Sequence, residues 1–248
     1  VPTTYPAKPV SGVLISGFVA LDFEKAVYPA SLIPTLKEMD YRIDVDYQKA
    51  RTDPDGFFED LFYTHERRTH AILHLMQKEP WDLFVAVFTG TDRLQHFFWE
   101  HMETGDSRYG NQFLTYYQRV DESIGEIMTQ VGEDVHLIML SDHGFCLLKK
   151  EVHLNYYLRQ RGYLKFKKDP PESLADIHPE SRAYCLDPSR IYINLKGREP
   201  QGCVEPGQAY DKLREQLVSE LANLTDETTG EKMVQKVWMR EELYHGPF

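Results

Sequence analysis

Apolar residues recur at helical spacing along two long stretches of the chain. In the stretch from Phe57 to about Lys78 they stand at positions 57, 58, 61, 62, 72, 73, 75 and 76, and Pro80 follows. The stretch 109–131 is amphipathic in the same way. These patterns predict two long helices. Shorter helices are predicted at 31–40, with Ser31 as its cap and Pro34 in its first turn, at 153–162 and at roughly 207–224.

Short apolar runs without helical spacing lie between the predicted helices. The runs WDLFVAVF (81–88) and VHLIML (135–140) are continuous and of strand length, and GVLIS (12–16), YRIDVDY (41–47) and RIYINL (190–195) are further predicted strands. Long helices that alternate with fully apolar strands are typical of βαβ units. The pattern therefore predicts an α/β fold with a mostly parallel sheet sandwiched by helices.

The character of the chain changes at about Lys149. Lys and Arg become denser there, and 167–182 is a loop that contains prolines. We therefore predict two parts: an α/β core segment, 1–148, and a cap or insertion, 149–248.

Composition excludes several classes of protein. With 248 residues, 42% of them hydrophobic, the chain can bury a substantial core. The net charge of −11, from 28 basic and 39 acidic residues, argues against nucleic-acid binding, which requires Lys and Arg to neutralise phosphates. No apolar stretch approaches the roughly 20 residues of a membrane span, and the first residues lack the features of a signal peptide. Three widely spaced cysteines favour a reducing compartment, and we predict a cytoplasmic protein.

Two of the predicted strands end in polar turns that carry Asp and His. Asp92 and His96 follow the first strand four residues apart, and Asp142 and His143 follow the second directly. A helix that begins near Thr91 would place Asp92 and His96 on one face, and the carboxyl ends of parallel strands meet at one edge of a sheet. Carboxylate oxygen with imidazole nitrogen suits Zn²⁺, Mn²⁺ or Fe better than Ca²⁺. The two pairs predict two divalent metals a few Å apart, an arrangement that clamps a phosphoryl group.

Each pair also has an ordinary structural interpretation. An Asp-His dipeptide is common in surface loops, and D-x-x-x-H on a helix is an equally unspecific pattern. The other histidines illustrate this, because His70 and His74 are also four residues apart but have no carboxylate at a strand end, and we interpret them as a partly exposed helix face. His101, His153 and His245 are likewise predicted not to be ligands.

The two turns together resemble a known family. TGTDRLQH (89–96) and SDHGF (141–145) resemble the paired metal-binding motifs of the alkaline phosphatase superfamily, and the branch they resemble is type I phosphodiesterase/nucleotide pyrophosphatase. GVLISGF, IYINLKGREPQG and YHGPF extend the resemblance over nearly the whole chain. It implies an alkaline-phosphatase-like fold and, for the intact protein, a phosphate-ester small-molecule substrate and two divalent metals, Zn²⁺ or Mn²⁺. We expect the chain by itself to bind metal weakly. By this resemblance Asp92 and His96 belong to one metal, and Asp142 and His143 to its neighbour.

The chain departs from the family pattern in two places. The family has a further Asp and a Thr or Ser nucleophile near its N-terminus, and a third His in a G-x-H turn near its C-terminus; we find none of them here. The chain is then either a fragment of a longer protein or a natural homologue that lost catalysis. We predict part of a two-metal phosphohydrolase that is inactive by itself. The alternatives are a phosphomutase- or sulfatase-like relative and a non-catalytic interaction domain that binds through 149–248.

Overall fold

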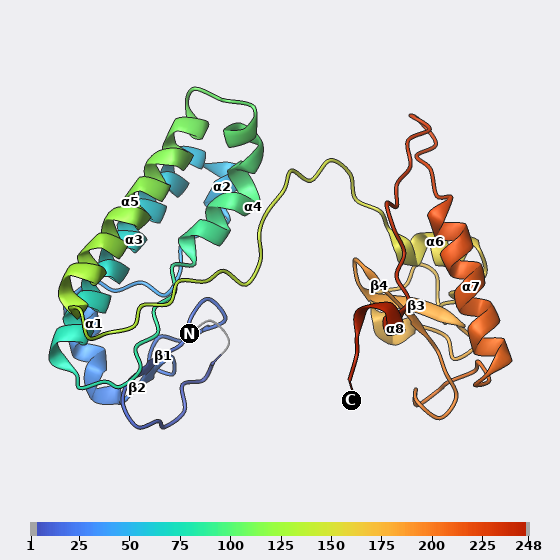
Figure 1. Ribbon diagram of the computed structural model, residues 1–248, viewed down its shortest axis with the longest axis horizontal. Coiled ribbons are helices and arrows are strands. Elements are labelled where there is room, and N and C mark those ends of the chain that lie inside the picture. The colour runs from blue at the N-terminus through green and yellow to red at the C-terminus, as the bar shows by residue number, and fades with distance from the viewer. Residues whose placement is uncertain (1–3, 247–248) are drawn as a thin grey trace. The chain divides into compact units, whose positions relative to one another are not determined.

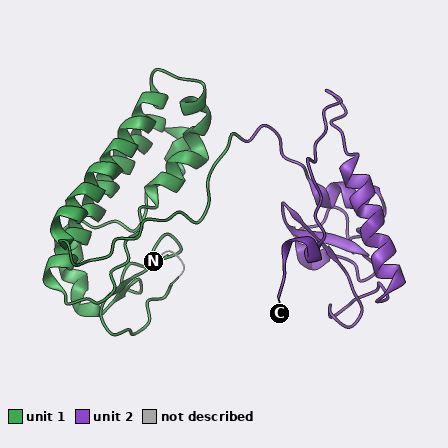
Figure 2. Cartoon of the chain, viewed as in Figure 1, with its two compact units in different colours: residues 1–147 green, residues 148–248 purple. Residues whose placement is uncertain are grey.

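The chain divides into two compact units, and the boundary lies between Leu147 and Leu148 (Figure 2). The computed structural model describes residues 4–246. Helices and small antiparallel sheets occur in both units, so the architecture is mixed α and β.

Three long helices dominate the first unit: α3 (Pro54–Lys78), α4 (Gly90–Glu103) and α5 (Tyr109–Val131), which pack side by side (Figure 1). Asp53 caps α3, because its Oδ1 accepts a hydrogen bond from the Gly56 amide at 3.1 Å, and Pro54 stands at the first helical position. The predicted helices at 57–78 and 109–131 are thus confirmed as α3 and α5.

The remaining elements of the first unit are short. Strand β1 (Leu14–Ile15) pairs antiparallel with β2 (Val27–Tyr28), and η1 (Ala30–Leu32), α1 (Ile33–Glu38) and α2 (Lys49–Thr52) follow. The predicted helix at 31–40 is confirmed as η1 and α1. Its predicted cap is wrong: Ser31 lies within η1, and Leu32 precedes α1 without a side-chain cap.

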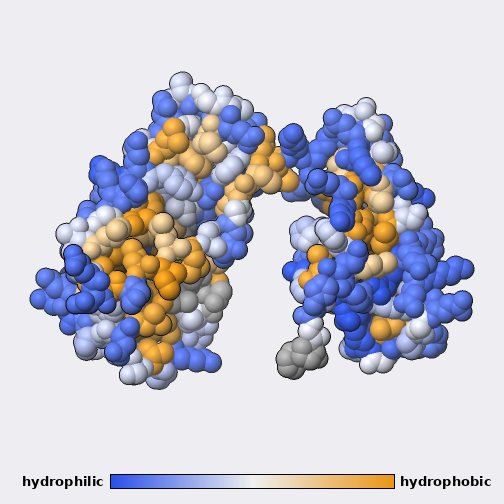
Figure 3. Space-filling view, in the orientation of Figure 1, coloured by the Kyte–Doolittle hydropathy of each residue, from blue (hydrophilic) through white to orange (hydrophobic). Residues whose placement is uncertain are grey.

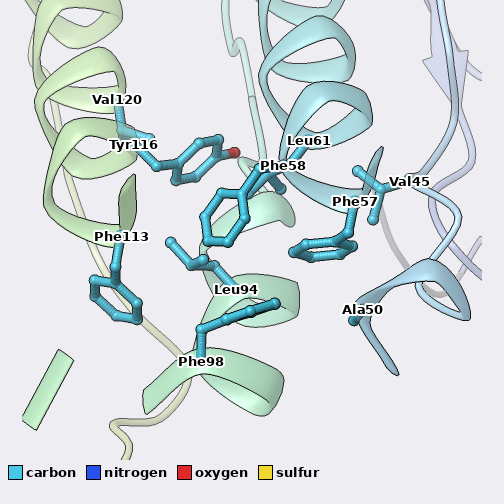
Figure 4. Packing of buried hydrophobic residues seen from close by; sticks show 10 residues of the cluster. All are labelled: Val45, Ala50, Phe57, Phe58, Leu61, Leu94, Phe98, Phe113, Tyr116 and Val120. Atoms are coloured by element: carbon cyan, nitrogen blue, oxygen red, sulfur yellow. The ribbon is translucent and has the colours of Figure 1, made fainter. Parts of the chain in front are cut away.

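An aromatic core joins the three long helices (Figure 4). The Phe58 ring lies 4.7 Å from the Phe98 ring and stacks on Tyr109 at 5.7 Å. The buried members of this core are Val45, Ala50, Phe57, Phe58, Leu61, Leu94, Phe98, Phe113, Tyr116 and Val120. The apolar stripes that predict α3 and α5 therefore pack against one another and against α4.

The predicted parallel sheet is not seen. Segments 41–47, 81–88 and 135–140 are not strands. The described residues contain only two sheets, each two-stranded and antiparallel: β1–β2, and the pair of β3 (Ala183–Asp187) and β4 (Arg190–Ile193). No backbone hydrogen bond joins 135–140 to another segment of the described chain, and Ile138 and Leu140 are 78% and 81% exposed. Figure 3 shows apolar surface of this kind in orange on the first unit. The physical reason is that an apolar run specifies an extended strand only where a neighbouring strand supplies its hydrogen bonds.

The second unit has its own core. It contains α6 (Leu154–Gln160), η2 (Leu174–Asp176), the antiparallel hairpin of β3 (Ala183–Asp187) and β4 (Arg190–Ile193), α7 (Gln208–Ala222) and α8 (Arg240–Leu243). The predicted helices at 153–162 and 207–224 and the strand at 190–195 correspond to α6, α7 and β4. The interpretation of this second unit as a cap stays a prediction.

Among the described residues, none of the helices combines the length and apolarity needed to cross a bilayer.

A buried histidine joins α3 to α5. His65 Nε2 lies 2.9 Å from the Ser123 hydroxyl, and burial lowers the pKa of His65 below its usual 6.5. Since the unfolded chain then binds more protons than the native one below pH 6.5, the free energy of unfolding should fall as the pH drops from 7.5 to 5.5, by at most about 1.4 kcal/mol per pH unit from this single proton. Urea unfolding at both pH values tests this.

The matched control for this prediction is His70, an exposed histidine on the same helix. His65→Gln should reduce the pH dependence, whereas His70→Gln should retain it. Equal pH dependence in wild type and His65→Gln would contradict the assignment.

Candidate functional site

Helix α4 carries the first predicted pair. It begins at Gly90, one residue before the predicted start at Thr91, and the Thr91 hydroxyl donates to the Phe88 carbonyl at 2.9 Å. Asp92 and His96 then lie one turn apart, and His96 Nε2 is 3.4 Å from Asp92 Oδ1. The spacing of four residues thus has the geometric effect predicted from the sequence.

The second pair comes to the same carboxylate. His143 Nε2 lies 3.6 Å from Asp92 Oδ1, the oxygen that His96 also faces. Asp142 is less engaged: its side chain is 89% exposed, and its Oδ2 is 3.9 Å from His143 Nε2. The structure therefore gathers His96 and His143 around Asp92, with Asp142 at the margin.

A backbone contact orients the His143 ring. Its Nδ1 lies 3.2 Å from the Gly144 carbonyl, and a carbonyl can only accept, so Nδ1 carries the proton when this hydrogen bond forms. In the neutral ring Nε2 then has a free lone pair, and it is this nitrogen that faces Asp92. Ser141 fixes the same turn by donating from Oγ to the His143 carbonyl at 2.5 Å.

An ion pair beside Asp92 was not predicted from the sequence. Arg93 donates to Asp44 Oδ2 from Nη2 at 2.6 Å and from Nε at 3.0 Å, and its Nη1 lies 3.9 Å from Asp92 Oδ2. The second oxygen of Asp92 thus faces a guanidinium, while the first faces two imidazoles. Asp44 is 48 positions before Asp92 in a segment that we predicted to be a strand, so no local signal connects the two.

Phe145 is a second residue that sequence reasoning missed. Its ring centre is 4.9 Å from that of His96, at a near-perpendicular angle, and 5.1 Å from that of His143. Trp99 stacks on it at 6.1 Å. Phe145 directly follows the SDHG motif, and that position was the one available signal. It packs against both imidazoles and limits how far each ring can turn.

That the other histidines, His245 among them, are not ligands stays a prediction. His70 and His74 are on α3, His101 Nδ1 is 3.0 Å from Asp106 Oδ2, and His153 immediately precedes α6. Among residues 4–246, no group of three or more His, Cys, Asp or Glu side chains is placed so that it could hold a metal ion. What the structure contains is two imidazole nitrogens that face one carboxylate oxygen.

Comparison with known families connects this arrangement to a class of enzyme. The family model for type I phosphodiesterase / nucleotide pyrophosphatase matches residues 2–248. The chain belongs to this family. Membership in the type I phosphodiesterase/nucleotide pyrophosphatase family confirms the resemblance predicted from residues 89–96 and 141–145, and places the chain in the alkaline phosphatase superfamily. The family acts on phosphate esters and generally depends on divalent metal, usually Zn²⁺. No curated protein and no solved structure matches the chain significantly.

Proposed function

We propose that this chain supplies metal ligands to a divalent-metal-dependent phosphoester hydrolase. The ligands are Asp92, His96, Asp142 and His143. The observation that carries the proposal is the convergence of His96 Nε2 and His143 Nε2 on Asp92 Oδ1, at 3.4 and 3.6 Å.

These separations fit donor atoms that share an ion. Two donors that are each about 2.0–2.1 Å from Zn²⁺ at a tetrahedral angle lie about 3.4 Å from one another. The carboxylate and imidazole donors suit Zn²⁺ and Mn²⁺ alike. Asp142 is 89% exposed and its Oδ2 lies 3.9 Å from His143 Nε2, so a rotation of its side chain would bring the carboxylate to an ion near His143.

The prediction of two ions, one at Asp92 and His96 and the other at Asp142 and His143, belongs to the same proposal. Asp92 supports it because its Oδ1 faces a ring from each pair, so ions bound by the two pairs would be neighbours. A bound divalent ion would stabilise the negative charge that develops on phosphoryl oxygens.

Other residues of this chain orient the proposed ligands. The Gly144 carbonyl holds the proton of His143 on Nδ1, which keeps Nε2 available. Phe145 restricts both rings, and Arg93 faces the second oxygen of Asp92, so that Oδ1 is the oxygen turned to the imidazoles. We assign no nucleophile, and the inactivity of the chain by itself stays a prediction.

Calorimetric titration with Zn²⁺ and with Mn²⁺ tests the proposal. His143→Ala should weaken ion binding by about tenfold to a hundredfold, because it removes one donor of the cluster. His74→Ala is the matched control, since it removes a histidine from the same unit that has no place in the site, and it should bind like the wild type. Wild-type protein that binds neither ion, or His143→Ala that binds both as well as wild type, would refute the proposal.

A further inference from the structure

A buried arginine contacts the segment that precedes α4, the helix that carries Asp92 and His96. Arg68, on α3, is 7% exposed, and its guanidinium reaches the segment that leads into α4. Nη1 donates to the Val87 carbonyl at 3.0 Å and to the Thr89 hydroxyl, and Nη2 donates to the Ile43 carbonyl at 2.5 Å. No carboxylate among residues 4–246 forms an ion pair with it.

A buried charge without a counter-ion depends on its hydrogen bonds. Arg68 Nε has no hydrogen-bond partner among the described residues, and the same is true of its neighbours Thr64 Oγ1 and His65 Nδ1. The bonds to Ile43, Val87 and Thr89, together with the nearby Tyr41 hydroxyl, therefore compensate for the desolvation of the cation. These hydrogen bonds therefore stabilise the segment 87–89 in its observed position.

Thr89 stands at the start of the helix that bears Asp92. It is the residue before α4, and its carbonyl accepts the hydrogen bond of the Arg93 amide at 3.2 Å. Its hydroxyl does not cap the helix, because it accepts from Arg68 instead. The first turn of α4 is thus tied to α3 through one threonine side chain.

Helix α5 also limits this turn, through Tyr116. A Cβ atom on Gly90 would lie 1.9 Å from the Tyr116 hydroxyl oxygen, so only glycine fits between the turn and that ring. Arg68 hydrogen-bonds to the segment that leads into α4, and Tyr116 limits the space at Gly90, so both residues restrict the start of the helix.

We propose that Arg68 is a positioning residue for the metal site. By fixing Val87 and Thr89 it sets where α4 begins, and thereby places Asp92 Oδ1 where His96 and His143 face it. This inference deepens the proposed function and rests on it.

The test compares two threonines that differ in their partner. Thr89→Val removes the hydroxyl that accepts from Arg68, whereas Thr69→Val makes the same change on α3, at 7% exposure compared with 9%, where the hydroxyl contacts Ser123. Thr89→Ser restores the hydroxyl. Two quantities are measured: amide hydrogen exchange over residues 90–96, and the affinity for Zn²⁺ and Mn²⁺ by calorimetry.

Thr89→Val should speed exchange at the first turn of α4 and lower ion affinity about tenfold, which corresponds to one hydrogen-bonded contact. Thr69→Val should leave both quantities at wild-type values even if it lowers stability, and Thr89→Ser should recover them. Arg68→Lys keeps the charge but replaces the guanidinium with one nitrogen, which cannot reach Ile43, Val87 and Thr89 together, so it should resemble Thr89→Val.

The results separate the two proposals. A wild-type chain that binds neither ion overturns the proposed function itself. Wild-type binding together with unchanged affinity in Thr89→Val, or equal losses in Thr89→Val and Thr69→Val, overturns only the role of Arg68.

Discussion

Asp92→Asn is expected to lower the affinity for Zn²⁺ about a thousandfold or more, or roughly 4 kcal/mol of binding free energy. Both imidazole nitrogens of the site face Oδ1 of this one carboxylate, at 3.4 and 3.6 Å. Asparagine keeps the shape of the side chain but removes the negative charge that offsets an ion, and it can present an N–H₂ group in place of an oxygen. The remaining donors are then two neutral rings and the exposed Asp142.

The control for this substitution is Asp121→Asn. Asp121 is an exposed carboxylate on α5 of the same unit, so its replacement makes the same change in net charge away from the site. Calorimetry with the two variants, with circular dichroism to verify folding, separates a ligand from a general effect of charge. If Asp92→Asn and Asp121→Asn weakened Zn²⁺ binding equally, Asp92 would not be a ligand.

Phe58→Ala is expected to lower the free energy of unfolding of the first unit by about 3–5 kcal/mol. The side chain is 2% exposed and its ring contacts those of Phe98 on α4 and Tyr109 at the start of α5. Truncation would leave a cavity where three helices meet, and neighbouring aromatic rings, which are stiff, cannot fill it by small rotamer changes.

Urea unfolding followed by circular dichroism measures this loss. Because the chain has two compact units, two transitions can occur, and only that of the first unit should move. Leu114→Ala is the control, since Leu114 is an exposed apolar residue on α5. A loss in Phe58→Ala no larger than that in Leu114→Ala would show that Phe58 is not part of a well-packed core.

The long helices could be predicted because their signals are local. In α3 the apolar spacing, the Asp53–Pro54 start and Pro80 after its end all lie within or next to the helix. The same holds for α5, whose apolar stripe from Phe113 to Ile127 is buried. Local spacing of this kind needs no information from distant parts of the chain.

The sheet could not be predicted in the same way. The run 135–140 has the composition of a buried strand, yet strand pairing depends on a second segment that the run itself does not specify. In the described residues no such segment pairs with it, and 81–88 is unpaired as a strand for the same reason. The composition of these two runs thus favours a strand, but it does not specify the neighbouring strand with which each would pair.

The contacts of the candidate site also fall into local ones, which could be predicted, and long-range ones, which could not. The pairing of Asp92 with His96 follows from one helical turn, and the adjacency of Asp142 and His143 is explicit in the sequence. The contact of His143 with Asp92, the ion pair of Arg93 with Asp44 and the position of Arg68 behind Thr89 all join segments at least 19 residues apart. Such contacts arise from tertiary packing, and they cannot be predicted from the local pattern of a single sequence.

The open backbone of 135–140 has a consequence for how the protein behaves at different concentrations. In the part of the chain that the structure describes, the backbone of 135–140 forms no hydrogen bond to another segment, and an exposed, apolar, proline-free run of this kind is a template on which an identical segment from another molecule can add. Mass action then makes self-association compete with the monomer as concentration rises. Because Ser141, Asp142 and His143 follow this segment directly, strand addition would crowd the same turn that faces Asp92. The occupancy of the site and the aggregation state of the protein would therefore be thermodynamically linked.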